Sequence, residues 1–361
     1  MGSVNTQATR STLTSVDTTL SANINATQDF IPVASTTNFS TSVVAEIEST
    51  NEVVSFASIT TNLFTYSEDF TQSFWSVAGS VTVTGDADTA PDGTTTADKV
   101  TPPSATNASM LGPFASINPS IDDTFSVFCK ADGFNFVNLV LQVGASNSSG
   151  GQFNLSTGTV VTTQNATASI SDEGNGWFRC SITMTTGNTA GIQLIQANSG
   201  GTPDTSNHFR STVAGDNSKS ILVWGAQLED ATSLSGYLPT VGASRSGLTT
   251  VTRGVNGTTA ASASSGDSIQ QLPYALSSVD MPVRLRAISV SPDGTGAARL
   301  TLCDNNGDTL CDVDIPDGKS YTLNLPEDGI IFPNGVFVSN TVKITAYTVY
   351  TEKYSGPYLT S

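Results

Sequence analysis

The sequence predicts an all-β protein, and three observations lead to this prediction. Only 12% of the 361 residues are charged, and the long runs of Ala, Glu, Lys and Leu that build helices are missing. Val, Ile, Phe and Tyr recur at intervals of one or two residues, which is the spacing of half-buried strands. The hydrophobic fraction of 37% suffices for a packed core and excludes a disordered chain. A chain of this length is expected to form two or three domains.

The charge of the chain limits its partners. Its 14 basic and 31 acidic residues give a formal net charge of −17, and the acidic residues are scattered along the sequence. Such a surface repels phosphate backbones and favours solubility. No apolar run is long enough to cross a bilayer, and the N-terminus lacks the basic and apolar regions of a signal peptide. We therefore expect neither nucleic-acid binding nor membrane insertion.

The chain begins with a segment that predicts no regular structure of its own. Residues 1–14 are polar and without periodicity, which is typical of an arm that becomes ordered along a neighbour in an assembly. Strand-like runs follow at residues 19–24, 30–33, 43–47 and 52–59. This series stops near residue 61 without a closing strand, so the first group of strands is incomplete by itself.

The middle of the chain predicts an antiparallel sandwich. Runs of strand length, separated by Gly and Asn, occur at residues 80–84, 124–130, 136–143, 152–154, 160–163, 177–185, 191–196 and 220–228. This spacing favours an antiparallel sandwich over βαβ units. In one run Phe125 and Val127 share a face while Phe128 lies on the other, so both faces carry apolar residues. The pattern indicates either a sheet covered on both sides or an outer face that binds a partner.

The last part of the chain predicts a second, compact sandwich. Alternating runs occur at residues 283–290, 298–303, 310–315, 321–325, 336–338 and 342–350. Cys303 and Cys311 flank an expected hairpin: a two-residue turn at Asn306 and Gly307 makes them diagonal neighbours, and a three-residue turn places them directly opposite. In either register we predict free thiols in contact, because a disulfide needs Cβ atoms closer than paired strands hold them.

Several stretches resemble modules of known proteins. Residues 63–75, 90–100, 175–180, 221–229 and 236–240 resemble the jelly-roll, carbohydrate-binding-like sandwiches of tailed-bacteriophage virion proteins. Residues 247–261 resemble the second half of a small β-domain of phage structural proteins, whose first half resembles residues 19–59. Residues 328–336 resemble a motif of the small β-domains with which phage head and tail proteins dock on a particle.

This resemblance implies a plan of four segments. Residues 1–14 form the N-terminal arm, residues 15–61 plus 247–271 a split small β-domain, residues 62–246 an inserted jelly-roll-like sandwich, and residues 272–361 a C-terminal β-sandwich. Insertion at a loop is tolerated when the termini of the guest lie close together. In the returning half, Gly254 permits backbone angles that a side chain would penalise, and Asn256 with Gly257 predicts a tight turn.

The resemblance also implies a function. The chain is expected to be a structural protein on the outside of a tailed-phage virion, either a capsid decoration or cement protein or a tail-associated fibre component. The split and C-terminal domains would attach it, and the inserted sandwich would project outward. Its partners would be other virion proteins and further copies of itself, as a homotrimer, and synthesis would take place in the cytoplasm of the host bacterium. Alternative interpretations are a host-glycan-binding adhesin and, third, a polysaccharide depolymerase.

The residues themselves predict neither catalysis nor a cofactor. No zinc signature, phosphate loop or nucleophile motif is present, and His208 is the single histidine. Adjacent carboxylates such as Glu229 and Asp230, or Asp122 and Asp123, point to opposite faces of a strand and do not share a glycosidase site. Four cysteines make no disulfide framework in a chain of this size, and Cys129 and Cys180 are expected as buried apolar groups.

Sugar binding has four candidate residues, because an aromatic ring offers a flat apolar face to a sugar. They are Trp75, Trp177, Trp224 and Tyr237. Packing in the core is the simpler explanation for Trp224, which lies in a hydrophobic strand, and for Trp177, which begins one. Trp75 is expected to close one end of the sandwich.

Overall fold

The computed structural model describes most of the chain, and the described part is all-β. It covers residues 8–11, 17–37, 39, 43–104, 109–115, 123–143, 147–184, 191–206, 209–212, 214–255, 258–271, 283–292, 294–303, 309–316, 319–325, 329–332, 337–342 and 344–353. The chain divides into two compact units, Thr60–Ser246 and a second unit of Met1–Ile59 with Gly247–Ser361. Within the described ranges, no helix is long and apolar enough to span a membrane.

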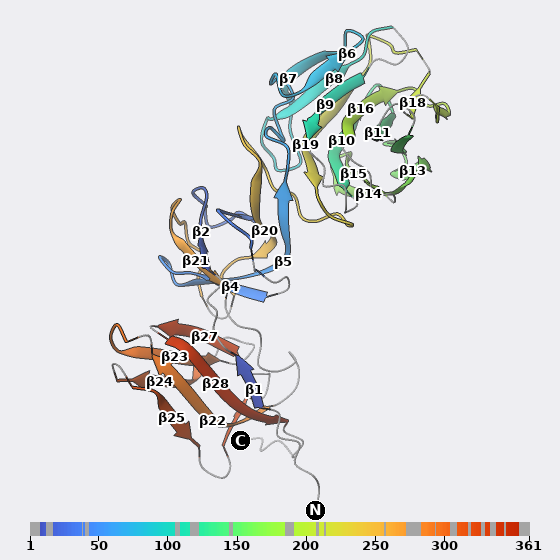
Figure 1. The fold of residues 1–361 in the computed structure, drawn as a ribbon. Coiled ribbons are helices and arrows are strands. Elements are labelled where there is room, and N and C mark those ends of the chain that lie inside the picture. Colours follow the sequence, from blue (N-terminus) through green and yellow to red (C-terminus); the bar gives the residue numbers. More distant parts are fainter. Residues whose placement is uncertain are drawn as a thin grey trace, which may run out of the picture. The chain divides into compact units, whose positions relative to one another are not determined.

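The unit Thr60–Ser246 is a sandwich of two six-stranded sheets (Figure 1). The first sheet has the order β14 (Ala166–Gly174), β15 (Trp177–Met184), β10 (Thr124–Asp132), β19 (Ser220–Glu229), β8 (Ala97–Thr101) and β7 (Thr82–Asp88). The second has the order β13 (Thr159–Gln164), β12 (Asn147–Asn154), β11 (Phe136–Val143), β16 (Gly191–Asn198), β9 (Ser109–Ala115) and β6 (Ser76–Ala78). A short hairpin, β17 (Pro203–Asp204) and β18 (Arg210–Ser211), follows the last residues of β16.

The core of this sandwich lies between the two sheets. Phe125 and Val127 of β10 pack in one cluster with Leu139 of β11, and all three are fully buried. On the other face of β10, Phe128 packs with Trp177 and Trp224 in a separate buried cluster. The first sheet is therefore covered on both sides, which is one of the two arrangements that the apolar residues on both faces of this strand predicted.

The other unit contains a six-stranded sheet whose strands come from before and after the sandwich in the sequence. Its order is β2 (Asp17–Thr19), β21 (Ser268–Gln271), β4 (Val43–Ile47), β5 (Glu52–Asn62), β20 (Arg245–Thr252) and β3 (Ile31–Val33). Its two edges meet where Leu20 pairs with Val33, through hydrogen bonds from Ala34 N to Thr19 O (2.9 Å) and from Ser21 N to Pro32 O (3.0 Å). The sheet thus closes into a small barrel, which removes its open edges.

The barrel core draws on both stretches of sequence, since Ile47 and Val54 pack with Leu248 and Ile269. Strands β5 and β20 are neighbours in the sheet. The chain leaves the barrel at the end of β5 and returns to it at the start of β20. Side-chain hydroxyls connect them at Ser58 with Thr249 and at Thr61 with Ser246, each pair 2.8 Å apart. The two ends of the intervening sequence therefore lie side by side.

Gly254 follows β20 with φ of +64°, as its expected conformational role requires. A Cβ atom at this position would lie 2.9 Å from Ala260 N, so a larger residue is excluded by contact as well as by backbone strain. The turn predicted at Asn256 and Gly257 lies outside the described residues.

The C-terminal strands form two small sheets around a third core. One sheet contains β1 (Ala8–Ser11), β28 (Ile344–Lys353), β22 (Val283–Pro292) and β25 (Tyr321–Asn324), with β26 (Ile330–Phe332) also paired to β22. The other contains β24 (Thr309–Ile315), β23 (Ala298–Cys303) and β27 (Phe337–Val342). Ile288 of β22, Leu300 of β23 and Val313 of β24 share one buried cluster, so this part is a sandwich.

Two expectations for this part of the chain need correction. Residues 8–11, expected to belong to an arm without regular structure of its own, form strand β1 and pair with β28 of the same chain, from Ala8 opposite Tyr350 to Ser11 opposite Tyr347. Edge strands offer unpaired backbone groups, which a polar segment of any periodicity can satisfy. Cys311 faces Leu302 rather than Cys303, because a register shift between residues 302 and 303 pairs Cys303 with Thr309. Both predicted hairpin registers are therefore wrong, while Cys311 is a free cysteine.

Candidate functional site

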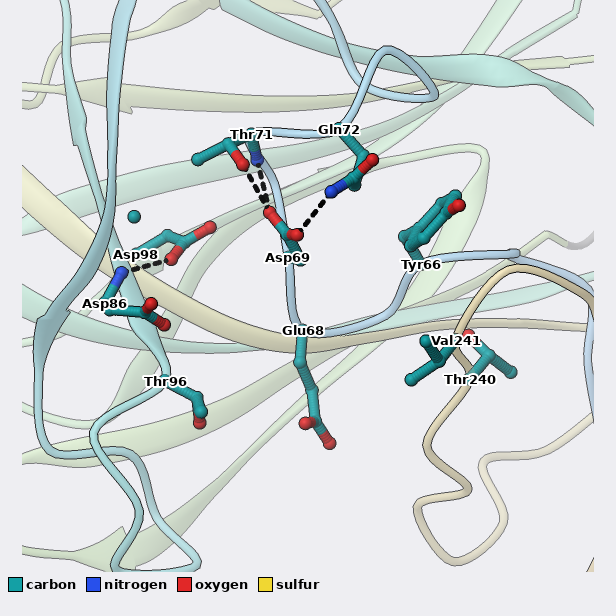
Figure 2. Close-up of a pocket in the computed structure, with 11 residues that line it drawn as sticks. Tyr66, Glu68, Asp69, Thr71, Gln72, Asp86, Thr96, Asp98, Thr240 and Val241 are labelled. Carbon is teal, nitrogen blue, oxygen red and sulfur yellow. Dashed lines mark hydrogen bonds between the residues drawn. The ribbon is translucent and has the colours of Figure 1, made fainter. Parts of the chain in front are cut away.

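The sandwich unit contains a pocket of about 360 Å³ near its first residues and its last ones. Three stretches of the chain form it: residues 66–72, residues 85–98 around β7 and β8, and residues 240–241. The lining residues are Tyr66, Glu68, Asp69, Thr71, Gln72, Gly85, Asp86, Thr96, Asp98, Thr240 and Val241 (Figure 2). All three stretches overlap or adjoin segments that the sequence analysis singled out for their resemblance, but no residue of the pocket was predicted as a site residue.

Buried hydrogen bonds hold the first and last stretches together. Ser67 is fully buried, and its Oγ accepts a hydrogen bond of 2.8 Å from Thr240 N. Its backbone N donates to Thr240 O (3.3 Å), and Ala226 N donates to Ser67 O (2.8 Å). The fully buried Asn62 donates from Nδ2 to the carbonyls of Ala226 and Leu238 at 3.1 and 3.0 Å. The relative position of these two pocket walls is therefore fixed by the fold.

The second wall is organised by Asp98, which is 2% exposed. Its Oδ2 accepts a hydrogen bond from Phe70 N (2.7 Å) and its Oδ1 one from Asp86 N (2.9 Å). Burial raises the pKa of Asp98 to about 6, against the two backbone N–H groups, which lower it. Asp98 thus fixes residues 66–72 against its own stretch, residues 85–98, and each of its two oxygens has a protein partner.

Asp69 is held by its own neighbours, as the dashed lines of Figure 2 show. Its Oδ1 accepts from Thr71 N (3.0 Å) and Thr71 Oγ1 (2.5 Å), and its Oδ2 accepts from Gln72 Nε2 (2.6 Å). Burial works to raise the pKa of Asp69, but these hydrogen bonds outweigh it and the pKa lies below its usual value. The carboxylate is therefore ionised at neutral pH.

The carboxylates of Glu68 and Asp86 differ in their hydrogen bonding to the protein. Burial raises the pKa of Glu68, while a hydrogen bond from the Tyr237 hydroxyl at 3.0 Å lowers it. Asp86 is exposed, and its carboxylate accepts no hydrogen bond from the described residues. Its backbone has φ of +52°, a left-handed conformation that Asp and Asn tolerate best among residues with side chains.

The aromatic residues predicted for sugar contact lie elsewhere. Trp75, Trp177 and Trp224 are 5%, 2% and 4% exposed, and their indole N–H groups donate to Tyr66 O (2.8 Å), Thr89 O (3.1 Å) and Thr96 Oγ1 (3.0 Å). The structure thus places all three rings in the interior, as core packing requires. Tyr237 is half-buried, and its ring packs 4.9 Å from that of Trp224.

Tyr237 connects the aromatic cluster with the pocket. Its hydroxyl lies 2.8 Å from Ser67 Oγ and 3.0 Å from Glu68 Oε1. Burial raises the pKa of this hydroxyl well above its usual value, so Tyr237 stays protonated. Tyr237 is therefore a supporting residue behind Glu68, whereas Tyr66 is the aromatic residue that lines the pocket.

Of the carboxylate pairs weighed for hydrolysis, the structure describes both members of one, Glu229 and Asp230, and these two do not share a site. Glu229 is buried and bonded to Gln227 Nε2 (2.8 Å), whereas the adjacent Asp230 is exposed. Asp123 is fully buried, and Asp122 and His208 lie outside the described residues. Among the described residues no group of three or more His, Cys, Asp or Glu side chains is arranged to hold a metal ion.

No protein-family model and no curated protein matches this sequence. Among solved structures, the chain is similar to the N-terminal CBM22-1–CBM22-2 tandem of carbohydrate-binding modules of Xyn10C from Paenibacillus barcinonensis, with 11% sequence identity and a TM-score of 0.29. The similarity covers 83% of this chain and 91% of the other. At this TM-score the architecture of the chain rests on its own strands and cores, described above.

Proposed function

We propose that the chain is a non-enzymatic structural protein on the outside of a tailed-phage virion, as a capsid decoration or cement protein or a tail-associated fibre component. The observation that carries this proposal is the insertion of one complete sandwich between two neighbouring barrel strands, β5 and β20. A barrel closed in this way keeps its own core while it carries a guest domain. The barrel and the C-terminal sandwich would attach to the particle, and the inserted sandwich would face the medium.

The composition supports this proposal. An acidic chain with a net charge of −17 suits an outer surface and is unsuited to contact with packaged nucleic acid. Copies of one chain on a particle follow the symmetry of that particle. We therefore propose a homotrimer whose further partners are other virion proteins, with synthesis in the host bacterium before assembly.

Purified full-length chain is expected to behave as a trimer without catalytic activity. Light scattering should give three times the chain mass of 37.3 kDa. Assays with polysaccharide, ester and peptide substrates should show no turnover, since the described carboxylates at Glu229 and Asp230 do not share a site. A monomer that cleaves polysaccharide would favour the depolymerase interpretation and contradict both parts of this prediction.

The location can be tested directly on particles. We expect an antibody raised against residues 60–246 to label intact virions in electron micrographs, at the head surface or along the tail. An antibody against residues 283–353 serves as the matched control, because the attached part is expected to be shielded. Particles that contain no copies of the chain by mass spectrometry would exclude a virion protein, and labelling only after disruption would exclude outward display.

A second function, glycan binding by the inserted sandwich, is favoured by the pocket. It offers about 360 Å³, within the size range of small-molecule sites, and combines acceptor carboxylates with an aromatic ring. In this interpretation the chain is an adhesin that contacts a host surface glycan. Both functions are compatible, because display on the particle would bring the pocket to the host surface.

A further inference from the structure

We infer that the pocket between residues 66–72, 85–98 and 240–241 binds a pyranose ring that carries no acidic group, and that an amine-bearing sugar binds more tightly than a neutral one. The inference rests on the glycan-binding role proposed for the inserted sandwich. It does not depend on the location of the chain in a virion.

The walls of the pocket differ in character, as a sugar ring requires. Tyr66 and Val241 pair through their backbones and provide an apolar side, and Val241 is 75% exposed. Asp86 and Asp98 lie on the other side, away from Tyr66, Thr240 and Val241, with Glu68 and Asp69 between the two sides (Figure 2). A pyranose has an apolar face formed by its C–H groups and an edge of hydroxyl groups. The two sides match these two surfaces.

The charge of the lining selects the class of sugar. Among the described residues, the pocket lining includes the four carboxylates Glu68, Asp69, Asp86 and Asp98 and contains no lysine or arginine. Arg245 attracts Glu68 electrostatically, but it donates to Pro239 O and is not part of the lining. Ionised carboxylates accept hydrogen bonds and donate none, so they suit hydroxyl and ammonium groups. A uronic or sialic acid would instead meet like charge.

A buried hydroxyl without a partner provides an independent indication of a ligand. Thr240 lines the pocket and is 1% exposed, and its Oγ1 has no hydrogen-bond partner among the residues that the structure describes. A buried polar atom without a partner is costly, and such atoms are rare in folded proteins. Because this buried oxygen makes no hydrogen bond, the Thr240 side chain can rotate towards a ligand in the pocket without breaking one. A hydroxyl of a bound sugar would therefore supply the partner that the protein does not.

Two isosteric substitutions separate binding from folding. Asp86→Asn removes one charge and keeps the backbone N–H that donates to Asp98. It also introduces asparagine, which tolerates the φ of +52° at this position well. Thr240→Val removes only a hydroxyl that makes no hydrogen bond within the described part of the chain. The matched control is Asp230→Asn, which removes one charge from an exposed residue of the same unit outside the pocket. Asp86→Asn and Asp230→Asn are expected to unfold at the temperature of the parent chain, and Thr240→Val at that temperature or above it, because it removes a buried hydroxyl without a partner.

The experiment uses full-length chain and the methyl glycosides of glucose, galactose, glucosamine and glucuronic acid, titrated by ligand-observed NMR. We expect binding of the first three, strongest for glucosamine, and none of glucuronic acid. Thr240→Val should weaken binding roughly three- to tenfold, and Asp86→Asn should weaken glucosamine binding about tenfold. Asp230→Asn should leave every affinity unchanged.

Different failures have different meanings. Binding that is unaffected by both pocket substitutions would overturn this inference while leaving a glycan-binding role for another surface of the sandwich. Preferential binding of glucuronic acid would overturn the assignment of ligand class. The full-length chain is also applied to an array of bacterial surface glycans, and the absence of binding to the glycosides and to the array would remove the glycan-binding role. None of these outcomes bears on the labelling of virions.

Discussion

Glu52→Ala is expected to destabilise the barrel by about 3–5 kcal/mol, because it leaves a buried arginine without its counter-charge. Glu52 is fully buried and the Arg253 side chain is 7% exposed. The two form a bidentate pair with Nε to Oε1 and Nη2 to Oε2 distances of 2.7 Å. Glu52 lies on β5 and Arg253 directly follows β20, so the pair joins the two halves of the barrel sequence.

Both members of this ion pair make further hydrogen bonds to the backbone. The carboxylate also accepts from Gly254 N and Ala261 N, both at 3.0 Å. The guanidinium donates in addition to Asn25 O (2.6 Å) and Ala261 O (2.7 Å). Burial acts to raise the pKa of Glu52, but the hydrogen bonds from Arg253 and the backbone outweigh it and the pKa is lowered. The loss of either side chain therefore leaves several buried groups without partners.

Hydrogen exchange of barrel peptides measures this effect. Protection within residues 43–62 should fall in Glu52→Ala, while tryptophan fluorescence should report an unchanged sandwich, since all three tryptophans belong to that unit. Asp314→Ala is the matched control: Arg299 Nε lies 2.6 Å from Asp314 Oδ1, but this pair is exposed. We expect no measurable change from that substitution. Equal effects of both substitutions would show that burial does not set the strength of these pairs.

A double replacement, Glu52→Met with Arg253→Met, tests the same explanation from the other side. It removes both charges together, so it should destabilise the barrel less than the sum of the two single replacements. Recovery should be incomplete, because Gly254 N and Ala261 N lose their acceptor in the double variant too. Strict additivity of the two single effects would contradict a specific coupling between Glu52 and Arg253.

Strands with a strong hydrophobic pattern could be predicted from the sequence. The predicted runs at residues 43–47, 136–143 and 298–303 coincide with β4, β11 and β23. The run at residues 166–174 was missed because β14 contains no buried residue and alternates only between half-buried and exposed positions. Its pairing with β15 depends on backbone hydrogen bonds, which leave little trace in the sequence.

The candidate site and the buried ion pair could not be predicted in the same way. Asp69, Asp86 and Asp98 look like turn residues in the sequence, and only the fold brings them together with Thr240. Glu52 and Arg253 are likewise 201 positions apart. Periodicity reports which face of a strand is buried, but it does not report which distant segment lies against that face. For Trp177 and Trp224, by contrast, the hydrophobic strands around them indicated core packing, and both side chains are buried.

Glu46→Gln is expected to stabilise the barrel at alkaline pH, which is the opposite sign to Glu52→Ala. Glu46 of β4 is 8% exposed, and burial together with the like charge of Glu48 raises its pKa from 4.5 to about 7. Between these two values the folded state holds a proton that the unfolded state has released. The contribution of Glu46 is therefore fully present below pH 4.5 and is lost as the pH rises towards and through 7.

The expected size follows from this shift. A difference of about 2.5 pKa units corresponds to at most about 3 kcal/mol, so we expect Glu46→Gln to stabilise the barrel by roughly 1–3 kcal/mol at pH 8 and to change little at pH 4. Calorimetric melting of the full-length chain from pH 4 to pH 8 measures it. Glu48→Gln is the control: it removes one like charge next to Glu46, so it should shift the pH window downwards without abolishing it. A barrel transition whose pH dependence is the same with and without Glu46 would show that this side chain is solvated in the folded state.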